Sequence, residues 1–165
     1  MSSVYIVQGD TAVGTDETLV ISTILGSCIS ICLWDPVAKV GGMNHLLLPE
    51  MINEGAHTSS GAVAMDRLIN QMMPLGAERP RLHAKLFGGS SMLAGRTDIG
   101  ARNAQFGRTY LKNENIPCDA ENVGGERARR LRFWPATGVA QMKFVEEAPV
   151  LEEPKTEPAN EVELF

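Results

Sequence analysis

The first half of the chain alternates between apolar and smaller or polar residues with a period of two, the pattern of a half-buried β-strand. The alternation is clearest at 29–34, where Ile29, Ile31 and Leu33 alternate with Ser, Cys and Trp. An Asp-Pro turn separates this stretch from a second strand at 40–48, so the two are expected to form a β-hairpin. Further strands are expected at 4–8, 18–23, 81–87, 116–123, 129–134 and 139–145.

Two segments have the 3.6-residue period of a helix instead. After a loop at 51–58, Ser59 or Ser60 can cap a helix that ends near Pro74. Asp98 is a suitable N-cap for a second helix. Because the strands come in runs rather than alternating with helices, the expected fold is α+β. We expect a single domain of mainly antiparallel β-sheets with about two packed helices.

Composition and charge divide the chain into a body and a tail. A chain of 165 residues is long enough for one domain with its own core. The net charge is −5, but residues 146–165 hold seven Glu and one Lys, which leaves residues 1–145 with a net charge of +1. The domain is therefore expected to span 1–145, and the acidic, proline-punctuated tail at 146–165 is expected to be disordered.

Composition also excludes some classes of function. Aromatic residues make up only 5 % of the chain and the net charge is negative, which argues against nucleic-acid binding. Three cysteines without a Cys-x-x-Cys motif indicate free thiols in a reducing compartment. There is no basic residue before Lys39 and no apolar run near the ~18 residues that span a bilayer. We therefore expect a cytoplasmic protein with no direct membrane insertion.

The strongest candidate for chemistry is Cys28, which follows Gly26 and Ser27 just before an apolar strand. Small neighbours leave its thiol sterically open, and backbone N–H groups at such a turn can form an oxyanion hole. Cys32 and Cys118 lie within strand patterns and are expected to be structural.

His45 is the expected partner of Cys28. It follows Gly41 and Gly42 on the next strand, and the hairpin could bring the two side chains together. A Cys–His pair is the minimum for thiol catalysis, because the imidazole generates the thiolate. Gly26, Ser27, Gly41 and Gly42 are expected to bind substrate or the oxyanion.

A series of motifs occurs in order across residues 4–145. They are Leu25-Gly26-Ser27-Cys28, Asp35-Pro36, Gly41-Gly42 through His45, Leu47-Leu48-Pro49, Lys85-Leu86-Phe87-Gly88-Gly89, Asp98-Ile99-Gly100 with Asn103, Ile116-Pro117, and Val123-Gly124-Gly125 ahead of a basic strand ending at Phe133. In type and spacing they resemble the CheD family, the chemoreceptor glutamine deamidases of bacterial and archaeal chemotaxis.

The resemblance implies a Cys, His and Thr triad, whose first two members match Cys28 and His45. The hydroxyl member is Ser22 or Thr23: Ser22 has the family's spacing of six residues before the cysteine, whereas Thr23 has the residue type. Successive strand side chains point to opposite faces, so only one of the two can orient His45. The residue type favours Thr23.

The resemblance also implies an activity, in which the thiolate attacks a glutamine carboxamide and hydrolysis of the thioester leaves glutamate. It implies no metal or organic cofactor, and a zinc site from Cys28, Cys32, His45 and His57 lacks the usual ligand spacing. The implied partners are the helical cytoplasmic bundle of chemoreceptors, at receptor arrays, and the CheC phosphatase. The alternative is a non-catalytic or dual-role adaptor that binds receptors and CheC.

Two features lie outside the implied chemistry. The basic run Arg127–Arg132 is either a solvated strand face or a contact surface for an acidic helical partner. The sequence closes with Val162-Glu163-Leu164-Phe165. The acidic tail at 146–165 either only solubilises the protein, docks in a partner's groove through these last apolar residues, or folds over the Arg127–Arg132 face.

Overall fold

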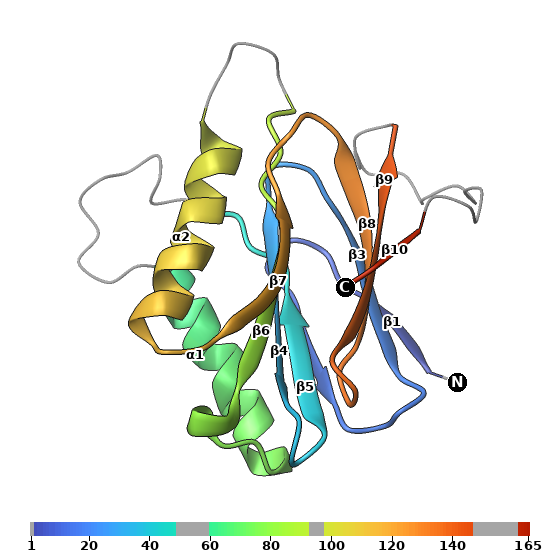
Figure 1. Cartoon of the computed structure of the whole chain (residues 1–165), viewed down its shortest axis with the longest axis vertical. Helices are drawn as coiled ribbons and strands as arrows, with labels where there is room; N and C mark the ends of the chain where they lie inside the picture. Colours follow the sequence, from blue (N-terminus) through green and yellow to red (C-terminus); the bar gives the residue numbers. More distant parts are fainter. Residues whose placement is uncertain (1, 49–59, 93–97, 147–161) are drawn as a thin grey trace.

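The computed structural model describes residues 2–48, 60–92, 98–146 and 162–165. They form three layers: two α-helices cover one face of a five-stranded sheet, whose other face packs on a second five-stranded sheet (Figure 1). The elements in chain order are β1 (Ser3–Tyr5), β2 (Thr11–Gly14), β3 (Val20–Leu25), β4 (Ile29–Asp35), β5 (Val40–Asn44), α1 (Ser60–Met72), the 3₁₀ turns η2 (Met73–Leu75) and η3 (Arg79–Arg81), β6 (His83–Gly88), α2 (Ile99–Asn113), β7 (Cys118–Val123), β8 (Ala128–Trp134), β9 (Val139–Val145) and β10 (Glu163–Leu164).

The two sheets differ in what covers them. The central sheet has the strand order β2-β5-β4-β6-β7 and lies between the helices and the outer sheet, whose order is β1-β3-β8-β9-β10. Neighbouring strands are antiparallel except in the pairs β1–β3 and β6–β7. The expected α+β fold with mainly antiparallel sheets is therefore confirmed, as is the β4–β5 hairpin.

Asp35 fixes the turn of that hairpin. Its Oδ1 accepts the N–H groups of Val37 and Ala38 at 2.9 and 3.0 Å, and Arg81 Nε donates to both carboxylate oxygens at 3.1 and 2.9 Å. Burial alone would raise the pKa of Asp35, but the bonds from Arg81, Ala38, Glu78 and Val37 outweigh it and hold the pKa at about 2. The fixed turn sets the register that brings the end of β5 to the start of β4.

Apolar side chains form one core on each face of the central sheet. The helix-side core packs the buried face of α1, including Met65, Leu68 and Ile69, against the central sheet. The inter-sheet core joins inward residues of both sheets, such as Ile21 and Phe87. All seven residues of β4 are buried because both faces of the strand are covered.

The structure differs from the sequence-based expectation in three places. Residues 11–14 form β2, where no strand was expected, and β5 ends at Asn44 rather than continuing to residue 48. Glu163–Leu164 form β10, whereas the whole tail was expected to be disordered. The last residues are ordered because they pair with the edge of β9 and because Phe165 packs against the inter-sheet core. The expected loop at 51–58, the cap candidate Ser59 and tail residues 147–161 lie outside the described residues.

Candidate active site

The turn that carries Cys28 crosses from β3 in the outer sheet to β4 in the central sheet. The Gly26 carbonyl accepts the Ser90 N–H at 3.0 Å, and the Cys28 carbonyl accepts the Gly89 N–H at 2.8 Å. Within the described part of the chain, the N–H groups of Ser27 and Cys28 have no hydrogen-bond partner. Fixed carbonyls with unpartnered N–H groups are what an oxyanion hole requires.

Asn103 ties this turn to the segment that follows His45. It projects from α2, is fully buried, and donates from Nδ2 to the Ser27 carbonyl at 2.8 Å. Its Oδ1 accepts the Leu48 N–H at 3.3 Å. Sequence reasoning placed Asn103 in a family motif. The signal that could have found its role is a polar side chain on the buried face of a helix.

His45 comes directly after β5 and is held by the N-terminal segment. The His45 N–H donates to the Asp10 carbonyl at 3.2 Å, and the His45 carbonyl accepts the Gly9 N–H at 2.9 Å. Sequence reasoning assigned this segment no role in the site. Burial lowers the pKa of His45 to about 4, against an opposing influence of the Asp10 charge. The imidazole is therefore neutral at physiological pH.

Thr23 determines which nitrogen of His45 carries the proton. Thr23 Oγ1 lies 2.7 Å from His45 Nδ1 and 2.7 Å from the Ile6 carbonyl oxygen. A hydroxyl has one proton and the carbonyl can only accept, so Thr23 donates to Ile6 and accepts from Nδ1–H. The lone pair of the neutral ring is then on Nε2, which is the arrangement a general base needs.

Ser22 does not share this arrangement. It lies on the opposite face of β3 from Thr23, opposite Arg132 of β8, and its carbonyl accepts the Ile6 N–H at 2.9 Å. Of the two hydroxyl residues, the structure brings Thr23 to His45 and leaves Ser22 on the outside of the sheet.

Cys28 and His45 lie on the same face of the central sheet. Ile29 and Leu46 form an isolated antiparallel bridge, with hydrogen bonds of 2.9 and 2.7 Å. Extending that register by one residue places Cys28 opposite Leu47, diagonal to His45 and on its face, where such neighbours are ~7–8 Å apart. Cys28 packs on the inter-sheet core, the same side as Thr23.

The thiol of Cys28 is neutral in this arrangement. Burial raises the pKa of Cys28 to about 11. These two described side chains, Cys28 and His45, share no hydrogen bond, and catalytic hydrogen bonds often tighten only when substrate binds. The resting site therefore holds a neutral thiol beside a neutral imidazole.

The glycines predicted to bind substrate or the oxyanion lie in two different parts of the structure. Gly26 lies in the cysteine turn itself, whereas Gly41 and Gly42 lie inside the buried strand β5. A Cβ on Gly41 would collide with the Pro135 carbonyl, and one on Gly42 would lie 2.8 Å from Leu68 of α1. Close packing on both faces of β5 thus explains the Gly-Gly pair.

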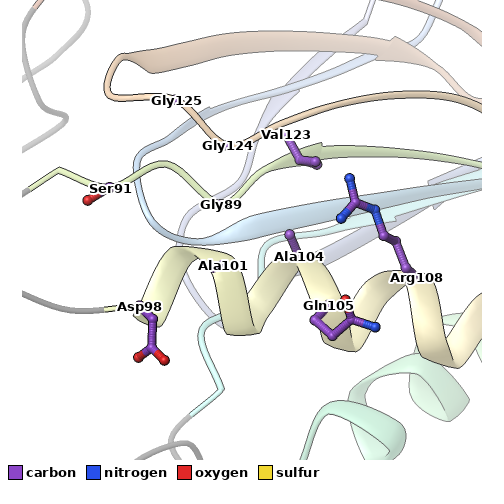
Figure 2. A pocket seen from close by; sticks show the side chains of 10 residues that line it. All are labelled: Gly89, Ser91, Asp98, Ala101, Ala104, Gln105, Arg108, Val123, Gly124 and Gly125. Atoms are coloured by element: carbon purple, nitrogen blue, oxygen red, sulfur yellow. The ribbon is translucent and has the colours of Figure 1, made fainter.

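A cavity of about 370 Å³ lies between α2 and the end of β7. Figure 2 shows Arg108 and Gln105 of α2 below it, with Gly89 and Gly124 across from them. Cys28, His45 and Thr23 do not line it. It borders the cysteine turn through Gly89, whose N–H holds the Cys28 carbonyl.

The arginines of the basic run Arg127–Arg132 do not share one surface, because β8 places some of them inside the protein and others outside. Arg129 is 2 % exposed and donates to Ser90 Oγ at 2.7 Å, to Asn122 Oδ1 at 2.7 Å and to the Gly124 carbonyl at 2.8 Å. Arg127 stacks over the Phe144 ring at 4.0 Å. Arg129 is therefore an internal support for the loops around the cysteine turn rather than part of a surface.

The described residues contain neither a metal cluster nor a membrane-spanning helix. Among them, no three His, Cys, Asp or Glu side chains gather as a metal site would require. None of the described helices is long and apolar enough to cross a bilayer.

Comparisons with known proteins agree on one family. Relatives called "Probable chemoreceptor glutamine deamidase CheD" include one from Cereibacter sphaeroides, 48 % identical over 88 % of this chain and 73 % of that protein. One from Zymomonas mobilis is 47 % identical over 86 % of this chain and 79 % of its own, and one from Caulobacter vibrioides is 44 % identical over 86 % and 78 %.

Among solved structures, Neisseria meningitidis protein NMB0706 aligns with a TM-score of 0.46 and 11 % identity, covering 76 % of this chain and 63 % of that one. That similarity is too weak to bear on function. The family model described as CheD chemotactic sensory transduction matches residues 46–144, beginning one residue after His45. With this match and these relatives, the chain belongs to the CheD family.

Proposed function

We propose that the protein is a glutamine deamidase that converts glutamine side chains of chemoreceptors to glutamate, with Cys28 as nucleophile and His45 as general base. The names of the curated relatives support the activity. The observation that carries the residue assignment is the chain of hydrogen bonds from Ile6 through Thr23 to His45 Nδ1, which leaves Nε2 as the basic nitrogen. Thr23, rather than Ser22, is the third member of the triad.

The reaction proceeds in two halves. His45 Nε2 takes the proton of the Cys28 thiol as Sγ bonds to the glutamine Cδ, and the carboxamide oxygen becomes an oxyanion that accepts the N–H groups of Ser27 and Cys28. The C–N bond then breaks, and His45 returns its proton to the departing ammonia. Water loses a proton to His45 and attacks the thioester, which releases glutamate and the thiol.

The pKa values of Cys28 and His45 in the empty site mean that the proton moves between them only when substrate is bound. A thiol with a pKa of about 11 does not ionise towards an imidazole with a pKa of about 4 in the empty site. Proton transfer is therefore coupled to attack, when the N–H groups of Ser27 and Cys28 stabilise the developing oxyanion and Thr23 stabilises the imidazolium of His45. This coupling keeps the thiol unreactive between encounters with substrate.

The proposed partners come from the resemblance to the CheD family. Chemoreceptor glutamines lie on the helical cytoplasmic bundle, so we place the protein at receptor arrays, with CheC as a second partner. The surface available for an acidic helix is smaller than the basic run indicates, because Arg129 is internal. Arg132 is exposed on the outer face of β8 and is the first residue to test for receptor affinity.

The direct test is incubation with a chemoreceptor cytoplasmic fragment, followed by peptide mass mapping of Gln-to-Glu conversion. Cys28→Ala should give no conversion, and Cys32→Ala is the matched control because Cys32 faces the same core without reaching the turn. Conversion by the Cys28→Ala protein would refute the assignment. Receptor binding without conversion by the unmodified protein would favour the adaptor instead.

A further inference from the structure

The last four residues of the sequence, Val162–Phe165, lie in the outer sheet as a bound peptide lies on a sheet edge. Phe165 and Ala140 exchange two backbone hydrogen bonds, of 2.7 and 3.1 Å. Glu163 pairs with Met142 in antiparallel register. Residues 146–161 separate this strand from the end of β9, whereas hairpin loops have about two to five residues. Contacts, not a local turn, therefore hold the segment in place.

Phe165 anchors the segment between the two sheets. Its ring meets Phe87 of β6 edge-on, with centroids 5.2 Å apart and an interplanar angle of 83°. It packs against the inter-sheet core, while its neighbour Leu164 points the other way and is 69 % exposed. Recognition therefore depends on one aromatic side chain of the segment.

Lys85 of β6 also contacts Phe165. Together with Phe87 it forms the binding site for this residue, which we call the Lys85–Phe87 seat. Lys85 is 8 % exposed, and its Nζ lies 5.0 Å from the Trp34 ring centroid. The ammonium donates to the Gly138 carbonyl at 2.7 Å and to the Phe165 carbonyl oxygen at 2.6 Å. A buried ammonium is costly unless it is hydrogen-bonded. The segment thus supplies an acceptor that the seat needs.

We propose that the edge of β9, together with the Lys85–Phe87 seat, is an exchangeable peptide-binding groove for an extended segment bearing an aromatic side chain, occupied in cis by the chain's own Val162–Phe165. Backbone pairing along an open strand edge gives affinity that does not depend on the sequence of the bound segment. The Lys85–Phe87 seat then selects a segment with an aromatic residue. So short a strand binds weakly as a free peptide, but its covalent connection to the domain raises its effective concentration at the edge of β9. A peptide of the same type gains access when that occupant is weakened.

The test uses the full chain with two substitutions. Phe165→Ala empties the seat, and Leu164→Ala is the matched control because that side chain points to solvent. The probe is a fluorescein-labelled, amidated peptide with the sequence of residues 158–165, followed by fluorescence anisotropy. The Phe165→Ala protein should bind it at least tenfold more tightly than the unmodified and Leu164→Ala proteins. Equal affinities, or equal binding of a probe with Ala in place of Phe, would overturn the proposal.

Hydrogen exchange gives a second readout that needs no probe affinity. The Ala140 N–H, which donates to Phe165, should be protected in the unmodified protein, exchange at least tenfold faster in Phe165→Ala, and regain protection when the probe is added. Unchanged exchange in Phe165→Ala would overturn the docking. A dimer of the unmodified protein that Phe165→Ala converts to monomer in sedimentation would overturn occupancy in cis. None of these readouts depends on deamidase turnover.

Discussion

Replacing Thr23 with Val tests whether the hydroxyl orients His45. Valine keeps the shape of threonine but removes the oxygen that bridges Ile6 and His45 Nδ1 at 2.7 Å to each. Both Thr23 and His45 are buried, at 0 % and 7 % exposure, so two polar groups lose their partner where water does not replace it. Each unsatisfied buried group costs about 1–3 kcal/mol.

The effect on catalysis follows from the tautomer. Without an acceptor at Nδ1, the neutral ring no longer has a fixed orientation or a fixed basic nitrogen. General-base catalysis is worth about 10²–10⁴ in rate, so we expect Thr23→Val to lower kcat about 10²-fold, or ~2.7 kcal/mol of activation free energy. Thr23→Ser retains the hydroxyl and should restore most of the rate.

The assay is initial ammonia release from a receptor fragment, together with thermal unfolding. In a domain of this size each kcal/mol corresponds to about 2–4 °C in Tm, so a loss of about 2–6 kcal/mol should lower the Tm of the Thr23→Val protein by about 4–24 °C. Rates are therefore compared at a temperature below the Tm of both proteins. Ser22→Ala is the matched control, because it is the next residue on β3 and faces outward. A folded Thr23→Val protein that releases ammonia as fast as the unmodified protein would refute the reasoning. An equal loss of rate in Ser22→Ala would refute it as well.

Four further predictions follow from the same contacts. Cys28→Ala should abolish ammonia release, whereas Cys32→Ala should retain it with a stability loss of about 1–3 kcal/mol; equal rates in the two would contradict the nucleophile assignment. Because burial raises the pKa of Cys28 to about 11, its alkylation by iodoacetamide should rise about tenfold per pH unit from pH 7 to 10; a plateau near pH 8.5 would contradict the neutral thiol. Asn103→Ala should cost about 1–3 kcal/mol and slow ammonia release more than tenfold, and an unchanged rate would show that the Ser27 carbonyl needs no anchor. The pKa of Asp35 is held at about 2, below its value in the unfolded chain, so its contribution to the free energy of unfolding is present above pH 4 and is lost as pH falls through 2. Urea unfolding at each pH should show a smaller loss of stability at low pH in Arg81→Ala, and a pH profile identical to that of the unmodified protein would refute the pairing.

Local patterns in the sequence were enough for the elements that a single stretch of chain specifies. The helix of α1 follows from its apolar face, and the β4–β5 hairpin from two strand patterns joined at Asp35. β2 was not predicted, because its four residues are all half-buried and the segment lacks the alternation of apolar and polar residues that marks a strand with one buried face. The Cys-His pairing was a plausible inference for the same reason as the hairpin: adjacent strands bring their ends together.

Tertiary structure decided what depends on contacts between distant segments. Thr23 and Ser22 are neighbours with hydroxyl groups, and only the packing of the outer sheet on the central sheet shows which one meets His45. The pKa values of Cys28 and His45 follow from burial between the two sheets, which no residue type encodes. Val162–Phe165 has no helical or strand period by itself. Its order comes from the open edge of β9 and the seat at Phe87, because strand pairing and apolar burial are properties of the partner surface as much as of the segment.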